Sequence, residues 1–403
     1  MQSKKAKRIE HFLINVFVFA LIGLLSLSFF NFHLFDPFTR AFKDLTLTDL
    51  YYSELLKKKV YNDNIIIVNI EHRSRYEIAE MIDSVQKYQP KVVGLDIIFS
   101  KKEDTGNVYL KAVFEKYDNY VFSYKGAFEP GETEVVSDPA MVAQKGGYVN
   151  LAGINKEHST VRYFYPHYHE QAAFTTNIIK KYDGQLAKRF NPAKDKPCEI
   201  RYFGGDSSFS KFDYAAIVSG GLDSNTIKNH IVLFGYLGVE NMTADRTKNL
   251  YTIDEDKLFT PLNGQLSGRS YPDMYGVTVH ANILRMMLDD DYIKVIPAWL
   301  VWTLAFLLSW ALVPVFCKWY NDRPMWFHPF TKFVQLFLSI VVVYISMLLY
   351  HYANIKLESA VLLAATVFLV DLILFYDAFV KFLKAKFHLN INSMFLEGHG
   401  HGH

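Results

Sequence analysis

Four long apolar segments constrain the fold of this chain more than any other feature of its sequence. They cover residues 12–31, 295–317, 333–353 and 359–382. A helix of about 20 apolar residues is long enough to cross the ~30 Å hydrocarbon core of a lipid bilayer. The sequence therefore predicts four transmembrane helices, one near the N-terminus and three near the C-terminus.

A cleaved signal peptide is the alternative interpretation of the first segment, because basic residues precede it within residues 1–11. However, the apolar run is longer than the usual core of a signal peptide, and no small-x-small cleavage site follows it. We therefore predict that residues 12–31 stay in the protein as an anchor behind a basic, cytoplasmic N-terminus.

The basic residues beside the apolar segments predict the orientation of the protein. Three of them lie in the loop at 318–332, and more follow the fourth segment in the tail at 383–403, whereas the loop at 354–358 holds only Lys356. By the positive-inside rule, the loop at 318–332 and both termini are cytoplasmic. Residues 32–294 are then predicted to lie on the outer side of the membrane.

Residues 32–294 have the pattern of an α/β domain. The runs NIIIVNI (64–70) and KVVGLDIIF (91–99) are typical of strands buried on both faces, and residues 75–88 between them have apolar side chains at helical spacing. A strand, a helix and a strand with short connections predict parallel strands and a mainly parallel or mixed sheet. Further strands are predicted at 120–125, 147–150, 160–168, 199–204 and 230–238, and helices at 35–59, 107–117, 171–182 and 275–288.

Composition and motifs argue against several classes of function. The formal net charge is only +2, which argues against a nucleic-acid partner. Cys198 and Cys317 are predicted to lie in different compartments, so we expect neither a disulfide nor a paired-cysteine metal site. The glycines that end the strand at 230–238 lack phosphate-loop spacing, and there is no nucleophile motif. We expect no cofactor and no catalytic set of residues.

Two acidic residues mark the first candidate ligand site. Asp96 and Glu71 stand at the ends of the two predicted strands, and ligands bind at the carboxyl ends of parallel strands. Paired carboxylates at this edge could hold a cation or exchange protons. The structural alternative is that Asp96 caps a helix or pairs with Arg73, Arg75 or Arg162. The lack of a nucleophile in the sequence beside them favours this alternative.

Asn150 and Arg162 are a second pair of candidates, because they flank the polar loop LAGINKEHST. Arg162 could hold an anionic ligand, or it could pack on a neighbouring strand of a hairpin. The sequence leaves both interpretations open.

Asp371 is unusual because it lies well inside the fourth apolar segment. An ionised carboxylate there costs roughly 2.5–3.5 kcal/mol on translocon scales, so this residue must face protein or be protonated. It could act as a proton-linked switch, or it could join two helices through a hydrogen bond to Thr303, Ser309 or Tyr344. A proton path usually needs more than one buried ionisable group, so we favour the helix contact.

The C-terminal tail contains His399, His401 and His403 at alternate positions. These histidines could bind a transition metal weakly. The Leu-Glu pair before them also resembles a cloning remnant, and we therefore assign no function to the tail.

The order of the motifs resembles the CHASE2 family, which is an extracytoplasmic sensory domain of bacterial membrane receptors. The matching runs are NIIIVNIE, QPKVVGLDIIF, GGYVN, TVRYF, IRYFGGDSSF, NHIVLFGYLG, FTPL and GVTVHANILRMML, and they extend from about Phe35 to the fourth apolar segment. The family also has one transmembrane helix before the domain and three after it. One departure is that this chain has Asn69 and Glu71 where members usually carry an aspartate near the end of the first strand.

The resemblance implies a bacterial inner-membrane sensor with a periplasmic domain. CHASE2 receptors normally continue into a cytoplasmic output domain, whereas only about 20 residues follow the fourth segment here, too few to bury a catalytic core. We therefore expect a non-enzymatic sensor that signals to a separate membrane or periplasmic partner, with a second copy of the chain as one candidate. The alternative is a constitutive docking subunit of an envelope complex, and an envelope enzyme is the least favoured class. The ligand is unknown.

Overall fold

The computed structural model describes residues 4–29, 51–52, 61–128, 131–140, 142, 146–151, 160–189, 195–239, 256–262, 272–388 and 393. The chain divides into two compact units. One is an α/β domain formed by Ala41–Ile293, and the other is a helical unit formed by Met1–Arg40 and Lys294–His403.

A six-stranded, fully parallel sheet forms the centre of the α/β domain, in the order β4-β3-β2-β10-β1-β9. The predicted α/β class with a parallel sheet is therefore confirmed. The first two strands are parallel as predicted, but β10 lies between them. The strands are β1 (Asn62–Asn69), β2 (Val92–Leu95), β3 (Tyr120–Tyr124), β4 (Gly147–Tyr148), β9 (Phe209–Phe212) and β10 (Ile231–Gly235).

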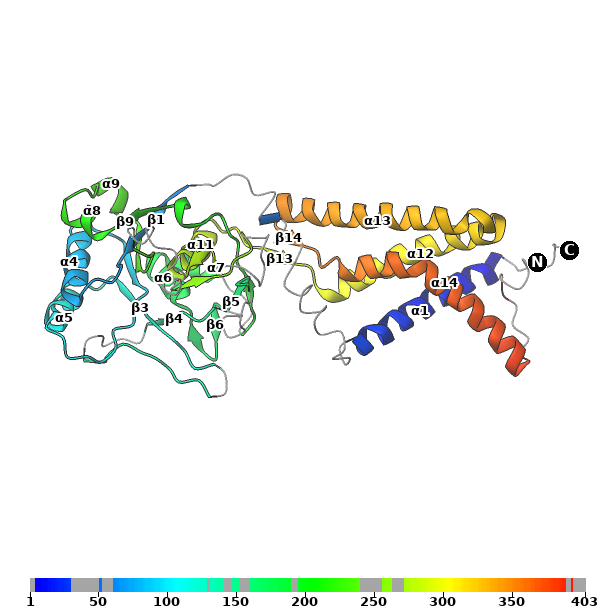
Figure 1. Ribbon diagram of the computed structural model, residues 1–403, viewed down its shortest axis with the longest axis horizontal. Coiled ribbons are helices and arrows are strands. Elements are labelled where there is room, and N and C mark those ends of the chain that lie inside the picture. The colour runs from blue at the N-terminus through cyan, green and yellow to red at the C-terminus, as the bar shows by residue number, and fades with distance from the viewer. Residues whose placement is uncertain are drawn as a thin grey trace, which may run out of the picture. The chain divides into compact units, whose positions relative to one another are not determined.

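Helices cover both faces of this sheet (Figure 1). Alternate strand residues such as Val68, Leu95 and Phe234 pack with α4 and α5 in one core cluster. On the other face, α6 packs on β2 and β3, and α11 packs on β1 and β10. The sheet is thus the middle layer of three. The helices are α4 (Arg75–Gln86), α5 (Gly106–Lys116), α6 (Phe174–Tyr182) and α11 (Gly276–Leu288).

Local sequence explains where two of these elements meet the sheet. Ser74 begins α4 with a capping box: its hydroxyl accepts the N–H of Glu77 at 3.3 Å, and the Glu77 carboxylate accepts the N–H of Ser74 at 2.8 Å. Gly94 lets α6 approach β2, since a Cβ at this position would lie 2.7 Å from Ile178 and 2.8 Å from Leu233.

Three parts of the domain differ from the prediction or lie outside what can be compared. β9, at one edge of the sheet, was not predicted. The strand predicted at 199–204 is reduced to β8 (Cys198–Glu199), which pairs antiparallel with β5 (Tyr163–Phe164) outside the main sheet. The helix predicted at 35–59 falls, except for residues 51–52, outside the described residues.

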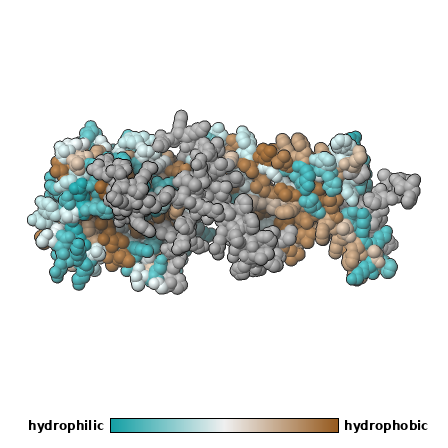
Figure 2. Space-filling view, viewed as in Figure 1, coloured by the Kyte–Doolittle hydropathy of each residue, from teal (hydrophilic) through white to brown (hydrophobic). Residues whose placement is uncertain are grey.

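Three helices of the second unit are long and apolar enough to cross a membrane: α12 (Ala298–Asp322), α13 (Pro324–Ala353) and α14 (Ala360–Phe387). Hydrophobic residues gather over these helices (Figure 2). This confirms the three apolar helices predicted near the C-terminus. The segment 318–332, predicted as a loop, is helical except at Arg323, because α12 and α13 each extend into it. The first predicted segment, 12–31, lies mostly in α1 (Lys4–Phe29), and its crossing of a membrane stays a prediction.

The helix α1 packs against α12 and α14 through a cluster that includes Ile14, Val18 and Ile22. Asn15 adds a buried polar contact, because its side-chain amide donates to the backbone oxygen of Phe306 at 3.0 Å and accepts from Ser309 at 2.7 Å. Such satisfied polar contacts hold helices together in an apolar environment. A short parallel pair, β13 (Lys294–Val295) and β14 (Ile355–Lys356), completes this unit.

Candidate functional site

The carboxyl ends of the six strands share one edge of the sheet, because all neighbouring strands are parallel. In open parallel sheets, ligands bind in crevices along this edge. Going from β1 to β10 to β2, the chain leaves the sheet at Asn69, Gly235 and Leu95. The side chains just after these three positions are therefore the first candidates for a binding site.

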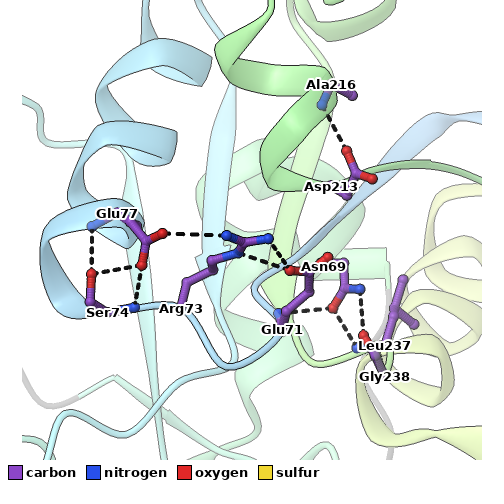
Figure 3. A network of polar contacts seen from close by, with 9 residues as sticks. All are labelled: Asn69, Glu71, Arg73, Ser74, Glu77, Asp213, Ala216, Leu237 and Gly238. Atoms are coloured by element: carbon purple, nitrogen blue, oxygen red, sulfur yellow. Dashed lines mark hydrogen bonds and ion pairs between the residues drawn. The ribbon is translucent and has the colours of Figure 1, made fainter. Parts of the chain in front are cut away.

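Asn69 fastens the end of β1 to the loop after β10 (Figure 3). Its side-chain oxygen accepts the N–H groups of Leu237 at 2.9 Å and Glu71 at 3.1 Å, and its amide group donates to the oxygen of Gly238 at 2.8 Å. The residue is 8% exposed. With three hydrogen bonds to backbone atoms, this side chain holds two strand ends together and has little capacity left for a ligand.

Glu71 is held by Arg73 in the turn between β1 and α4. The Arg73 Nε donates to Glu71 Oε2 at 2.8 Å, and its Nη1 donates to Glu77 at 3.3 Å (Figure 3). Glu71 also has a φ of 46°, in the left-handed region that non-glycine residues seldom adopt, and its N–H bond to Asn69 supports this conformation. The structure therefore places Glu71 in an ion pair with Arg73, and not in the carboxylate pair with Asp96 that the sequence suggested.

The Arg73 guanidinium also lies 4.5 Å from the ring centroid of Tyr214, whose hydroxyl donates to Glu80 at 2.8 Å. Tyr214 opens the short helix α8 (Tyr214–Val218), and Asp213 caps this helix by accepting the N–H of Ala216 at 2.7 Å (Figure 3). The charged and polar side chains at the end of β1 thus bind one another or the nearby backbone.

Asp96 stands at the end of β2 in a different environment. Its N–H continues the sheet by donating to the oxygen of Phe234 at 2.8 Å. Among the residues that the structure describes, none forms a hydrogen bond or ion pair with its carboxyl group. Burial raises the pKa of this carboxyl to about 7, because the charged form loses solvation without gaining a partner. At neutral pH the group can therefore donate or accept a hydrogen bond.

The arginines expected as partners of Asp96 are engaged elsewhere. Arg73 binds Glu71 and Glu77, and Arg75 donates to the side chain of Asn107 at 2.5 Å and the oxygen of Ser100 at 2.6 Å. The predicted ion pair of Asp96 with Arg73 or Arg75 is therefore not formed, because the turn after β1 and the start of α5 use both guanidinium groups.

Asn150 and Arg162 are not brought together with Asp96. Asn150 follows β4 and clamps Gly126 after β3, accepting from its N–H at 2.7 Å and donating to its oxygen at 3.0 Å. Arg162 precedes β5, and its backbone oxygen accepts the N–H of Ile200 at 2.8 Å. Asn150 thus joins two strand ends at the same edge, while Arg162 lies beside the separate β5–β8 pair. The loop between them is outside the described residues at 152–159.

Sequence reasoning missed an aromatic pair at this edge. Tyr236 directly follows β10, and its hydroxyl is joined by a hydrogen bond of 3.3 Å to the Nε2 of His72, which follows Glu71. Tyr236 also makes an edge-on contact with Tyr275, with ring centroids 5.8 Å apart. His72 is next to Glu71, which was named from the sequence, and Tyr236 lies within the strand predicted at 230–238. Their position just after neighbouring strands is the signal that could have found them.

A second unusual titratable group is buried in the helix layer that covers the other face of the sheet from α4. His280 of α11 is 5% exposed, contacts the ring of Phe174 edge-on at 5.6 Å, and has a buried Nδ1 without a hydrogen-bond partner among the described residues. Burial lowers the pKa of this imidazole to about 4. The residue is therefore neutral at physiological pH, as a core histidine.

Asp371 contacts a neighbouring helix, but through a different partner from those expected. Lys332 of α13 lies 3.3 Å from its Oδ1. Of the hydroxyls proposed from the sequence, Ser309 bonds to Asn15 and Thr303 bonds to the oxygen of Trp299 in its own helix. The carboxylate is half exposed in the isolated unit, and a lysine on α13 can reach it, so an ion pair replaces the expected neutral hydrogen bond.

The described residues contain no group of three or more histidine, cysteine, aspartate or glutamate side chains arranged to hold a metal ion. His399, His401 and His403 lie outside the described residues.

Comparison with known proteins gives one family. A family model described as the CHASE2 domain matches residues 14–316, which is more than half of the chain and includes the whole six-stranded sheet. No curated protein and no solved structure matches the chain.

Proposed function

Because the chain belongs to the CHASE2 domain family, a family of sensory domains, we propose that it is a non-enzymatic membrane sensor whose α/β domain binds a small molecule. The binding site is the carboxyl edge of the sheet around Asp96. The chain then passes the signal through its helices to a partner.

The environment of Asp96 is the observation that carries this proposal. The ends of β1, β3 and β4 are fastened by Asn69 and Asn150, and the charges near β1 are paired. The carboxyl of Asp96 instead has no partner within the part of the chain that the structure describes, and its pKa is raised to about 7. Asp96 is only partly exposed, and a partly buried polar group without a partner is costly, so we infer that this one is maintained for a ligand rather than for stability. A ligand that offers an amine or hydroxyl group fits a carboxyl that can donate or accept.

The proposed location is the inner membrane of a bacterium, with the α/β domain in the periplasm and both termini in the cytoplasm. The distribution of lysine and arginine beside the apolar segments supports this orientation. Ligand binding would favour one of two arrangements of the domain and thereby shift the population of helix packings. A membrane or periplasmic protein, or a second copy of this chain, reads that shift.

Purification of the full chain from its native membrane in mild detergent tests this proposal. Mass spectrometry would identify every small molecule and protein retained at stoichiometric levels. A retained small molecule that is lost from Asp96→Asn but kept by Asp63→Asn supports a sensor with its site at β2, because Asp63 is an exposed acidic residue of the same sheet. Retention of the same molecule by both variants would contradict the site.

A constitutive docking subunit is a second candidate, favoured by an exposed aromatic pair. Tyr76 on α4 and Tyr109 on α5 pack edge-on at 4.8 Å while remaining 50% and 53% exposed, and the adjacent Val108 is 72% exposed. Exposed apolar groups that cluster on a surface mark interaction sites. A docking subunit would copurify with its partner proteins at fixed stoichiometry. The double variant Tyr76→Ser, Tyr109→Ser would no longer retain these partners. A sensor would keep its small molecule in this double variant.

A further inference from the structure

The turn between α12 and α13 contains an aromatic cavity that the proposed sensory function does not use. Its volume is about 420 Å³, and it is open to the surroundings. Five of its six lining residues are apolar or aromatic, and one is basic. They are Trp319, Arg323, Trp326, Pro329, Phe330 and Phe333.

The walls of this cavity are fixed by ring stacking across the turn. Trp319 of α12 lies on Phe330 of α13, with ring centroids 3.6 Å apart and planes 9° from parallel. Trp326 and Phe333 are 61% and 68% exposed. The cavity thus combines a rigid aromatic wall with apolar side chains that are free to contact another molecule.

Arg323 supplies a positive charge at the cavity. Its guanidinium lies 5.9 Å from the ring centroid of Trp319, and it forms no hydrogen bond or ion pair with any side chain that the structure describes. Lys318 is also exposed on this part of α12, while Asp322 is the exposed acidic residue next to Arg323. The basic group that lines the cavity is therefore available to a negatively charged ligand.

The position of the cavity decides what kind of ligand it meets. Arg323 is the one non-helical residue between two helices that are each long and apolar enough to cross a membrane. Trp319 and Phe333 lie 4 and 10 residues from it, which is about 6 and 15 Å along the helices. The turn is therefore at a membrane surface, with the aromatic wall extending from the headgroup level toward the acyl chains.

We propose that this cavity is a binding site for one anionic phospholipid. The phosphate of the lipid lies against Arg323, and an acyl chain lies along Trp319, Trp326 and Phe333. Arginine recognises phosphate through its planar set of donors, and basic groups at a membrane surface favour anionic lipids. A lipid bound here fixes the turn that joins α12 to α13.

Quenching of tryptophan fluorescence by brominated lipids tests this site directly. The full chain, with Trp299, Trp302 and Trp310 changed to Phe, retains only the two tryptophans of the cavity. It would be placed in nanodiscs that contain increasing amounts of brominated phosphatidylglycerol, or of phosphatidylethanolamine with the same brominated chains. We expect half-maximal quenching at a clearly lower fraction of the anionic lipid than of the zwitterionic lipid.

Arg323→Gln should raise the phosphatidylglycerol fraction needed for half-maximal quenching about fivefold, as expected for one basic group at a membrane surface. Lys318→Gln is the matched control, since it removes the same charge from the nearby end of α12 without lining the cavity, and it should change this fraction less than twofold.

Three results would overturn the proposal: equal quenching by both lipids, equal effects of the two variants, or displacement of the lipid by soluble glycerol phosphate. The last result would mean that the site recognises a free phosphate compound rather than a lipid.

Discussion

The ends of β1 and β2 lie two strands apart on the same edge of one sheet, and they use their polar residues in opposite ways. At β1, Asn69 makes three hydrogen bonds to backbone atoms, and Glu71 is paired with Arg73. At β2, the carboxyl of Asp96 has no partner among the described residues. The first end is completed by the fold itself, whereas the second end has an unused polar group.

This difference shows how a site can be separated from a scaffold when both contain similar residues. An acidic side chain at a strand end says little until its partners are known, because ion pairs are common at such positions. Glu71 satisfies its charge locally, and it then stabilises the turn into α4. The Asp96 side chain has no partner among the residues that the structure describes, and we therefore interpret it as the residue maintained for a ligand.

The largest expected effect comes from removing the Asn69 side chain, which holds the end of β1 to the loop after β10. Asn69→Ala leaves two backbone N–H groups and one backbone oxygen without their partners, and we expect it to destabilise the domain by about 3 kcal/mol. Hydrogen–deuterium exchange of the β1 and β10 amides in the full chain would measure the loss. Asn64→Ala, an exposed position on the same strand, is the control and should change exchange little. Equal exchange in the two variants would mean that the network does not hold the strand ends.

The second prediction concerns the pH dependence of stability that the Asp96 carboxyl causes at the end of β2. The folded-state pKa of Asp96 is raised to about 7, so the folded protein binds this proton more tightly than the unfolded chain does, and stability falls as pH rises from about 4 to about 7. The linkage sets an upper limit of about 4 kcal/mol, and partial exposure reduces the expected value to about 2 kcal/mol. The thermal midpoint of Asp96→Asn should therefore exceed that of the wild type by more at pH 8 than at pH 5.

Titration of His280 does not affect the comparison of the Asp96→Asn and wild-type thermal midpoints. Its lowered pKa destabilises the fold as pH falls below about 6.5, which is the opposite direction, but it is present in both proteins. The difference in midpoint between Asp96→Asn and wild type thus reports Asp96 alone. A difference that stays constant from pH 5 to pH 8 would contradict the prediction, because it would show that the pKa of Asp96 is not raised into this range.

The smallest expected effect is the coupling between Glu71 and Arg73. Their side chains are 13% and 32% exposed, so we expect a coupling free energy of roughly 0.5–1 kcal/mol. A double-mutant cycle with Glu71→Gln and Arg73→Gln, read from thermal unfolding at low and high salt, would measure it. A coupling free energy larger than the destabilisation caused by Asn69→Ala would contradict this account, because the ion pair would then stabilise the end of β1 more than the hydrogen bonds of Asn69 do.

Much of the fold could be predicted from the sequence because the strongest signals are local. The β-branched runs that became β1, β2 and β10 and the helical spacing in α4 and α11 identify buried strands and helices without knowledge of their neighbours. The three C-terminal apolar helices were found for the same reason. The strand β9 was missed because Phe209–Phe212 is short and its place at the sheet edge depends on pairing with β1.

The site was harder to predict because side-chain partners are not local. The sequence named Asp96 and Glu71 as residues at the ends of two parallel strands, but it placed these strands side by side and could not tell which carboxyl group would be paired. That depends on Arg75 turning to Asn107, 32 residues away, and on β10 entering between β1 and β2. Asp371 shows the same limit, since its partner Lys332 is 39 residues away on another helix.

The central claim is that Asp96 is the ligand contact of the domain, and a thermal-shift comparison tests it most directly. Wild type, Asp96→Asn and Asp63→Asn would each be heated with and without the filtered small-molecule fraction of an envelope extract. We predict that the fraction raises the midpoints of wild type and Asp63→Asn by the same amount and leaves that of Asp96→Asn nearly unchanged. A rise of equal size in all three proteins would contradict the claim, because the ligand would then bind without this carboxyl.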